Sequence, residues 1–175
     1  MWFEATLIGV FCYLGALSSP WLLGLTGGWY ILSRPLVSGM VVGAILGDIQ
    51  TGIVIGVAVQ AVYIAMVTPG GSMPADLNFV AWPAIALGIL SGQGTAVAVA
   101  LAATIGILGT ILFNAMMVLN SYWNHRADVA AEQGDERGIY LNSAIGPQAT
   151  NFLLRFVPSF IAVFFGARYI NGVMD

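Results

Sequence analysis

The fold is decided by an uncharged stretch, residues 77–125, which reads LNFVAWPAIALGILSGQGTAVAVALAATIGILGTILFNAMMVLNSYWNH. A helix needs about 20 apolar residues to cross a bilayer core, so this stretch has room for two membrane segments. Further uncharged runs surround it and cover residues 5–33, 35–47, 49–75, 138–154 and 156–167. These runs lack the alternating pattern of a membrane β-strand. The sequence therefore predicts an all-α, polytopic membrane bundle of about five to six embedded segments.

The composition excludes most soluble functions. Of the 175 residues, 59% are hydrophobic and 7% charged, whereas a soluble domain carries roughly 25% charge. The five basic residues are all arginines and do not cluster, which excludes a basic nucleic-acid binder. The single cysteine, Cys12, excludes a disulfide framework. We find no spacing of His, Cys or acidic residues typical of a metal site and expect no metal or other cofactor. Residues 1–175 are interpreted as a single membrane domain.

One polar stretch, residues 124–137, interrupts the apolar sequence and reads NHRADVAAEQGDER. It must lie in water or at the membrane interface. Residues 126–133 are predicted to form a short surface helix that ends at Gly134. We place this stretch in the cytoplasm. His125 has no fixed partner nearby in the sequence, and no nucleophile motif is present, so we expect no catalytic residue on this chain.

Glycines recur at short intervals in the middle of the chain, and they occupy positions 39, 43, 47, 52 and 56. Faces of small residues let helix backbones approach closely in lipid. This spacing indicates close helix packing and names no function.

Asp48 interrupts the apolar sequence at a turn, where it is flanked as LGDIQTG over residues 46–52. An aspartate at such a turn favours a helix N-cap, and a direct ligand role is compatible with capping. The preceding residues, 35–47, span only about 20 Å as a helix. They are predicted to form a re-entrant half-helix or the end of a full span that begins before Arg34.

Gln60 lies in the middle of an apolar segment, where an unpaired amide is costly. It must face a partner or a cavity. An amide has both donor and acceptor atoms, as sugar hydroxyls require. An interhelical hydrogen bond is an equally open interpretation.

A helix cannot continue through residues 68–78, TPGGSMPADLN, which contain two prolines and two glycines. Broken helices of this kind form substrate sites in transporters, where irregular backbone lines a cavity. Asp76 and Asn78 follow the break and are candidates to bind hydroxyls; a simple surface loop is the alternative. Three tryptophans, Trp21, Trp29 and Trp82, are expected at the membrane interface.

Several short motifs occur in an order that resembles a known family. They are Tyr13-Leu-Gly, Ser19-Pro-Trp21, Arg34-Pro-Leu36, Leu46-Gly-Asp48, Thr51-Gly-Ile53, Pro69-Gly-Gly-Ser72 and Pro74-Ala-Asp76, followed by His125-Arg-Ala-Asp128 and Gly134-Asp135. The set resembles the IIC membrane subunit of the mannose-type (mannose, fructose and sorbose) phosphoenolpyruvate-dependent sugar phosphotransferase system. The N-terminal Ser-Pro-Trp and the Gly-Gly-Ser break look most like the N-acetylgalactosamine-type branch.

The resemblance implies a multi-pass protein of the bacterial cytoplasmic (inner) membrane. Its sugar would be phosphorylated on release by a soluble IIB subunit, which IIA supplies with phosphate. It also implies a IID membrane partner, a trimeric assembly and elevator-type movement of an inverted-repeat fold. The family carries an acidic or amide residue at the position of Gln60. Family members continue beyond the position of Asp175, so we expect a chain shortened at its C-terminus.

Together these observations predict a sugar-translocating subunit for a hexose or N-acetylhexosamine. Its substrate would be held by Gln60, Asp76, Asp48 and Asn78. The alternative is a shortened, non-transporting membrane scaffold that binds IID.

Overall fold

The computed structural model describes residues 1–21, 24–66 and 73–174, and the described residues form helices and no strand. The elements, with η marking π-helices, are α1 (Trp2–Leu14), η1 (Leu25–Leu32), α2 (Pro35–Leu46), α3 (Ile49–Tyr63), α4 (Leu77–Phe79), η3 (Val80–Ala84), α5 (Ile85–Ser91), α6 (Thr95–Glu132), α7 (Glu136–Tyr140), η4 (Leu141–Ile145) and α8 (Gly146–Met174). The all-α prediction is confirmed.

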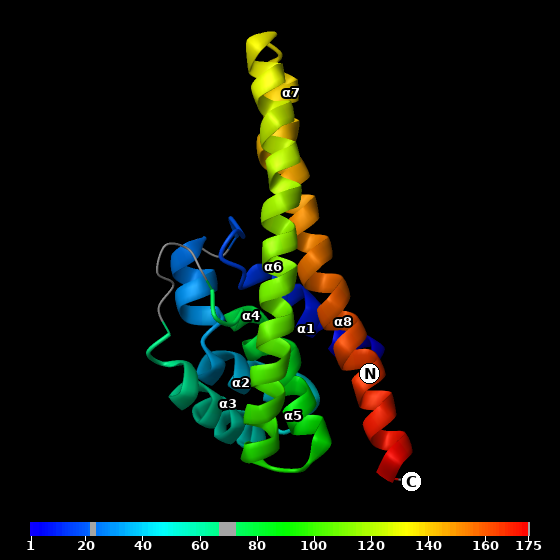
Figure 1. Cartoon of the computed structure of the whole chain (residues 1–175). Coiled ribbons are helices and arrows are strands. Elements are labelled where there is room, and N and C mark those ends of the chain that lie inside the picture. Colours follow the sequence, from blue (N-terminus) through cyan, green and yellow to red (C-terminus); the bar gives the residue numbers. More distant parts are fainter. Residues whose placement is uncertain (22–23, 67–72, 175) are drawn as a thin grey trace.

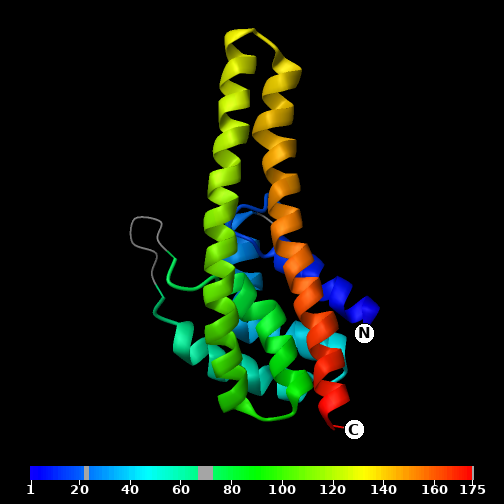
Figure 2. The same ribbon diagram turned by 45° about the vertical axis from the view of Figure 1, so that its right-hand side comes forward.

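A long antiparallel hairpin dominates the shape. It consists of α6 on one side and α7, η4 and α8 on the other, and it projects well beyond the bundle of shorter helices (Figures 1 and 2). The 38 residues of α6 give a length of about 57 Å. The hairpin turns at Gly134, whose φ of +67° favours glycine, and Asp135 then caps α7 by accepting the Gly138 N–H at 3.0 Å. The predicted surface helix before Gly134 exists, but as the continuous end of α6, because no proline interrupts residues 95–132.

The chain is a membrane protein with several kinds of apolar segment. Two helical stretches, Thr95–Glu132 and Glu136–Tyr169, are long and apolar enough to cross a bilayer. The pair η1 and α2 passes the same test only when taken together, and its two parts are bent by 79°. Three shorter apolar helices cover Trp2–Leu14, Ile49–Tyr63 and Leu77–Ser91. Within the described residues, two spans, or three if the bent pair is one span, therefore pass the test, and the predicted five to six embedded segments are reached only if the shorter apolar helices are counted as well. The bend makes α2 either part of a broken span or a re-entrant segment.

Helices α2 and α3 pack closely through glycine. A Cβ atom added to Gly43 would lie 2.9 Å from the Ile49 Cα, and one added to Gly52 would lie 2.8 Å from the Gly43 Cα. Gly39 and Gly56 meet in the same way, so the close packing predicted for these four glycines is confirmed. Gly47 has a different role, because it caps the C-terminus of α2 with a left-handed φ of +83°.

Aromatic rings in the first two thirds of α8 hold this helix against α1. Phe152, Phe156, Phe160 and Phe164 stack along α8, with centroids 5.1–5.8 Å apart. Gly9 of α1 leaves room for this ladder, because a Cβ there would lie 2.9 Å from the Phe156 ring.

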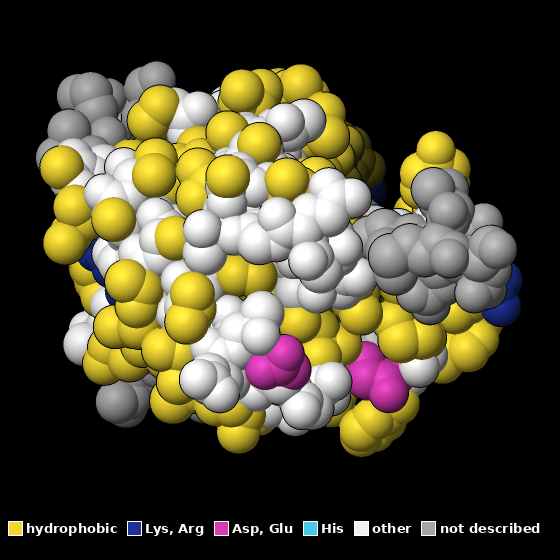
Figure 3. Space-filling view, turned by 90° about the horizontal axis from the view of Figure 1, so that it is seen from below, with side chains coloured by type: hydrophobic (Ala, Val, Ile, Leu, Met, Phe, Trp, Pro, Cys, Tyr) yellow, Lys and Arg dark blue, Asp and Glu magenta, His cyan; other side chains and the backbone are white. Residues whose placement is uncertain are grey.

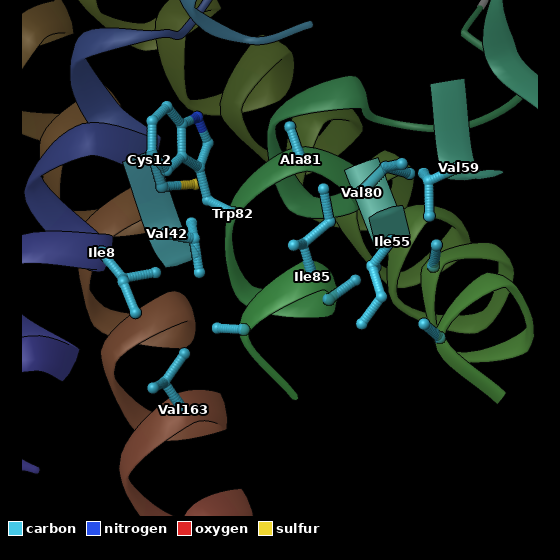
Figure 4. Packing of buried hydrophobic residues seen from close by; sticks show 14 of the residues in the cluster. Ile8, Cys12, Val42, Ile55, Val59, Val80, Ala81, Trp82, Ile85 and Val163 are labelled. Atoms are coloured by element: carbon cyan, nitrogen blue, oxygen red, sulfur yellow. The ribbon is translucent and has the colours of Figure 1, made fainter. Parts of the chain in front are cut away.

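The broken segment from α4 to α5 lies at the centre of the core. Trp82 is fully buried, stacks on Phe11 with centroids 5.2 Å apart, and lies beside Cys12 (Figure 4). Trp29 is also buried, in a cluster with Leu77 and Phe113. The interface prediction is therefore wrong for Trp82 and Trp29, since helix packing encloses both rings. Trp21 is exposed, as expected for an interface residue.

The outer surface is largely apolar. Figure 3 shows one face that is mostly hydrophobic with isolated acidic side chains. Many large apolar side chains are exposed on α6 and α8, among them Ile107, Leu108, Ile111, Val118, Leu153, Ile161 and Phe165. Such a surface matches lipid or other membrane helices as its neighbours.

Candidate functional site

The backbone is irregular where the broken segment begins. Residues 67–72, which hold most of the predicted break, lie outside the described residues, and the chain then passes through 73–76 into the three-residue helix α4. The following π-helix η3 contains Pro83, which has no N–H to donate to the carbonyl of Asn78 five residues earlier. The Cys12 thiol contacts that carbonyl instead, at 3.8 Å. The break therefore leaves backbone groups that side chains from other helices satisfy.

Asp76 is fully buried, and its backbone N–H and both of its carboxylate oxygens make bonds to other residues. Its backbone N–H donates to the Gly106 carbonyl of α6 at 3.0 Å. One carboxylate oxygen accepts the Asn78 N–H at 2.9 Å, which caps α4, and the other pairs with the guanidinium of Arg155. Asp76 thus joins α4 to both long helices of the hairpin.

Small residues on α6 make this approach possible. A Cβ added to Gly109 would lie 2.7 Å from the Asp76 Cβ, and one added to Gly106 would lie 2.6 Å from the Val80 side chain. The two glycines let the broken segment lie directly against the backbone of α6.

Asn78 is fully buried and anchors the end of α1. With its amide oriented to match its neighbours, Nδ2 donates to the Gly15 carbonyl at 2.8 Å and Oδ1 accepts the Ala16 N–H at 3.2 Å. The Ser33 hydroxyl lies beside this amide and donates to the same Gly15 carbonyl at 2.8 Å. Asn78 therefore bonds the Gly15 carbonyl, which the backbone of α1 leaves free, and adds an acceptor for the Ala16 N–H, which also donates to the Tyr13 carbonyl at 3.0 Å.

Helix α8 contributes polar residues that sequence reasoning missed. Asn151, Arg155 and Ser159 are spaced four residues apart on one face and are each at most 2% exposed. Arg155 also lies over the Phe79 ring, with its Cζ 5.6 Å from the centroid. A signal was present, because Arg155 is the single charge between two uncharged runs, and an ionisable residue within a membrane segment marks a functional candidate.

Several buried polar atoms around this cluster have no protein partner within the described part of the chain. They are Trp82 Nε1, Asn151 Oδ1 and Nδ2 and Arg155 Nη2, and Ser159 Oγ has only the Cys12 thiol beside it. An unpaired buried polar atom costs about 1–3 kcal/mol, so these atoms are expected to bond a group other than the described residues, such as ordered water or a ligand.

The other two predicted residues lie elsewhere. Gln60 is half-buried on α3, and its Oε1 is enclosed without a partner among the described residues, so the interhelical bond is absent at that atom. Asp48 is exposed at the turn between α2 and α3, where it accepts the Thr51 N–H at 3.0 Å. The predicted cap is confirmed. The structure brings Asp76 and Asn78 together, whereas Asp48 bonds only within its own turn.

A separate groove of about 910 Å³ opens at the end of the hairpin, and residues from α6, α7, η4 and α8 line it, including His125, Arg126 and Arg137. No group of three or more potential metal ligands occurs within the described ranges.

The family model for the sorbose-specific IIC component of the phosphotransferase system (PTS) matches residues 2–175. The chain belongs to this family. The sorbose-specific EIIC component of Klebsiella pneumoniae is 28% identical over 81% of the chain and 53% of the relative. The fructose permease IIC component of Bacillus subtilis is 30% identical over 61% of the chain and 39% of the relative. A putative N-acetylgalactosamine permease IIC component of Escherichia coli is 29% identical over 65% of the chain and 84% of the relative.

The IIC chain thus spans about half or less of the first two relatives. Two solved structures share its fold at 20% identity. One, described as a membrane protein, matches with a TM-score of 0.79 over 98% of this chain and 67% of that chain. The other, the mannose transporter ManYZ in complex with a microcin, matches with a TM-score of 0.77 over 98% of this chain and 68% of that chain. The family and the membrane bundle predicted from the sequence are both confirmed.

Proposed function

We propose that this IIC chain is the sugar-translocating membrane subunit of a phosphotransferase transporter. It binds a hexose or N-acetylhexosamine and passes it to a soluble IIB subunit for phosphorylation. The observation that carries the proposal is the break at α4, where Asp76 and Asn78 are buried between the long helices of the hairpin and the end of α1. Broken helices that gather polar groups within a membrane are typical of transporter substrate sites.

The proposed substrate ligands are Gln60, Asp76, Asn78 and Asp48. Gln60 has an enclosed carbonyl oxygen that is free to accept from a hydroxyl. Asp76 and Asn78 already make hydrogen bonds to other residues of this chain. A sugar hydroxyl that binds either residue therefore replaces one of these internal hydrogen bonds. Asp48 contributes an exposed carboxylate that a hydroxyl can approach.

The proposal also covers the location of the chain in the cell and its partner subunits. Residues 1–175 act as one domain of the bacterial cytoplasmic membrane, with the hairpin end at 124–137 in the cytoplasm. The partners are a IID membrane subunit, the soluble IIB and IIA subunits and further copies in a trimer. Family membership supports these partners, and the exposed apolar residues of α6 and α8 offer a surface for membrane helices. The phosphate comes from IIB, and no catalytic residue is assigned to this chain.

Sugar uptake that depends on phosphoenolpyruvate tests the proposal. The chain is coexpressed with IIA, IIB and IID in cells that lack other permeases for the sugars tested. Radiolabelled mannose, fructose, sorbose and N-acetylgalactosamine are supplied in turn. We expect one of them to accumulate as its phosphate, and a control without IIB to accumulate none.

A scaffold that binds IID without transporting sugar is the second candidate, favoured by the apolar surface of the hairpin. Copurification with IID without uptake or binding of any of the four sugars would favour it over the transporter.

A further inference from the structure

The buried face of α8 changes character along its length. Positions 151, 155, 159, 163 and 167 recur every four residues and are all buried. The last two are valine and alanine, as expected for packing in a membrane protein, whereas the first three are Asn151, Arg155 and Ser159. Polar side chains in such a position require hydrogen-bond partners.

Most of the hydrogen-bonding capacity of this polar stripe, residues 151, 155 and 159, is unused within the described chain. Arg155 uses Nη1 to bond Asp76, but its Nη2 and both amide atoms of Asn151 make no bond to a described residue, and the hydroxyl of Ser159 has only the weakly bonding Cys12 thiol beside it. These side chains are at most 2% exposed, so the surface of a neighbouring protein does not reach them. A small molecule that enters when the surrounding helices separate can.

The unused atoms define the chemistry of that molecule. The Asn151 amide and the Ser159 hydroxyl each offer a donor and an acceptor, and Arg155 offers a donor. Because Asp76 already balances the charge of Arg155, the stripe as a whole favours a neutral ligand over an anion. Hydroxyl groups, which donate and accept at one oxygen, match this combination.

We propose that Asn151, Arg155 and Ser159 form one side of the sugar site and bind sugar hydroxyls opposite α4. The inference rests on the proposed function. It adds residues of α8, which belong to none of the sequence motifs. The stripe is closed to solvent in this structure, so the sugar reaches it when α4 separates from α8.

The test replaces the unpaired amide by an apolar group of similar shape. Asn151→Leu is prepared in the full chain, assembled with IID in lipid nanodiscs, and titrated with radiolabelled mannose, fructose, sorbose and N-acetylgalactosamine. For the sugar that the unmodified assembly binds, we expect Kd to rise at least tenfold. The melting temperature should stay the same or rise, because leucine needs no hydrogen-bond partner.

Asn124→Leu is the matched control. Asn124 is exposed near the end of α6, fifteen residues beyond Gly109 and about 22 Å along the helix from the contact with Asp76. Its Kd should stay within twofold of the unmodified value. Ser159→Ala removes a single hydroxyl with little effect on packing. It serves as a second test if Asn151→Leu fails to assemble, and we expect it to raise the Kd for the sugar about threefold.

Unchanged sugar affinity in both α8 variants would overturn the inference and leave the stripe to ordered water, with the proposed function intact. An unmodified assembly that binds none of the four sugars would overturn the proposed function and this inference together.

Discussion

Asp76 and Arg155 lie 79 residues apart in the sequence and form a buried ion pair that ties the broken segment to α8. The pair is the point at which the break meets the long hairpin. Its geometry is reinforced from both sides, since Asp76 also caps α4 and donates its N–H to α6, while Arg155 lies over the ring of Phe79.

Removing one partner of this pair should destabilise the protein more than removing both charges. Arg155→Met leaves the Asp76 carboxylate buried without its cation, which costs about 3–5 kcal/mol. The melting temperature in detergent, followed by tryptophan fluorescence, should fall by roughly 10 °C. The double variant Asp76→Asn with Arg155→Met keeps an acceptor for the α4 cap and should recover at least half of that loss. If it melts no higher than Arg155→Met, the two residues are not coupled as the ion pair indicates.

The close approach of α2 and α3 should not tolerate a side chain at Gly52. A Cβ there would lie 2.8 Å from the Gly43 Cα, and backbone atoms cannot move aside cheaply. Gly52→Val should therefore lower the melting temperature by several degrees or prevent assembly, because overpacking costs about 1–3 kcal/mol or more. Val57→Leu, on an exposed position of the same helix, should leave the melting temperature unchanged. Equal behaviour of the two variants would contradict the observed packing.

The sequence predicted the features that depend on nearby residues. Asp48 caps α3 as expected, because an N-cap needs only a short side chain and an N–H a few residues on. The glycines of α2 and α3 were recognisable from their spacing. The Asp76–Arg155 pair could not be recognised in this way, because no local sequence pattern relates two residues so far apart in the chain.

The tryptophans show where a general residue preference fails. The general enrichment of tryptophan at membrane interfaces gave the wrong place for Trp82 and Trp29, because burial depends on which helix faces the ring. For Trp82 that partner is Phe11 of α1, which only the assembled fold identifies.

Replacing Gln60 by leucine should abolish sugar binding and leave the fold intact. The enclosed Oε1 of Gln60 has no described partner, so leucine removes an unpaired acceptor and no internal bond at that atom. The assembly with IID should keep its expression level and melting temperature, while sugar binding in nanodiscs falls below detection. Gln133→Leu, at the exposed end of the hairpin, is the matched control and should bind sugar normally. Retained affinity in Gln60→Leu would remove this residue from the proposed site.

The side of the membrane on which the hairpin ends can be tested with one cysteine. Cys12 is fully buried, so the unmodified chain should not react with a membrane-impermeant maleimide. Asp128 is exposed near the end of α6, and Asp128→Cys adds an accessible thiol. A cytoplasmic hairpin end predicts labelling in inside-out vesicles and none in intact spheroplasts, with detergent-solubilised protein as the positive control. Labelling only in intact spheroplasts would place residues 124–137 on the outside, away from IIB, and the hand-off of sugar would then have to occur at the opposite end of the molecule.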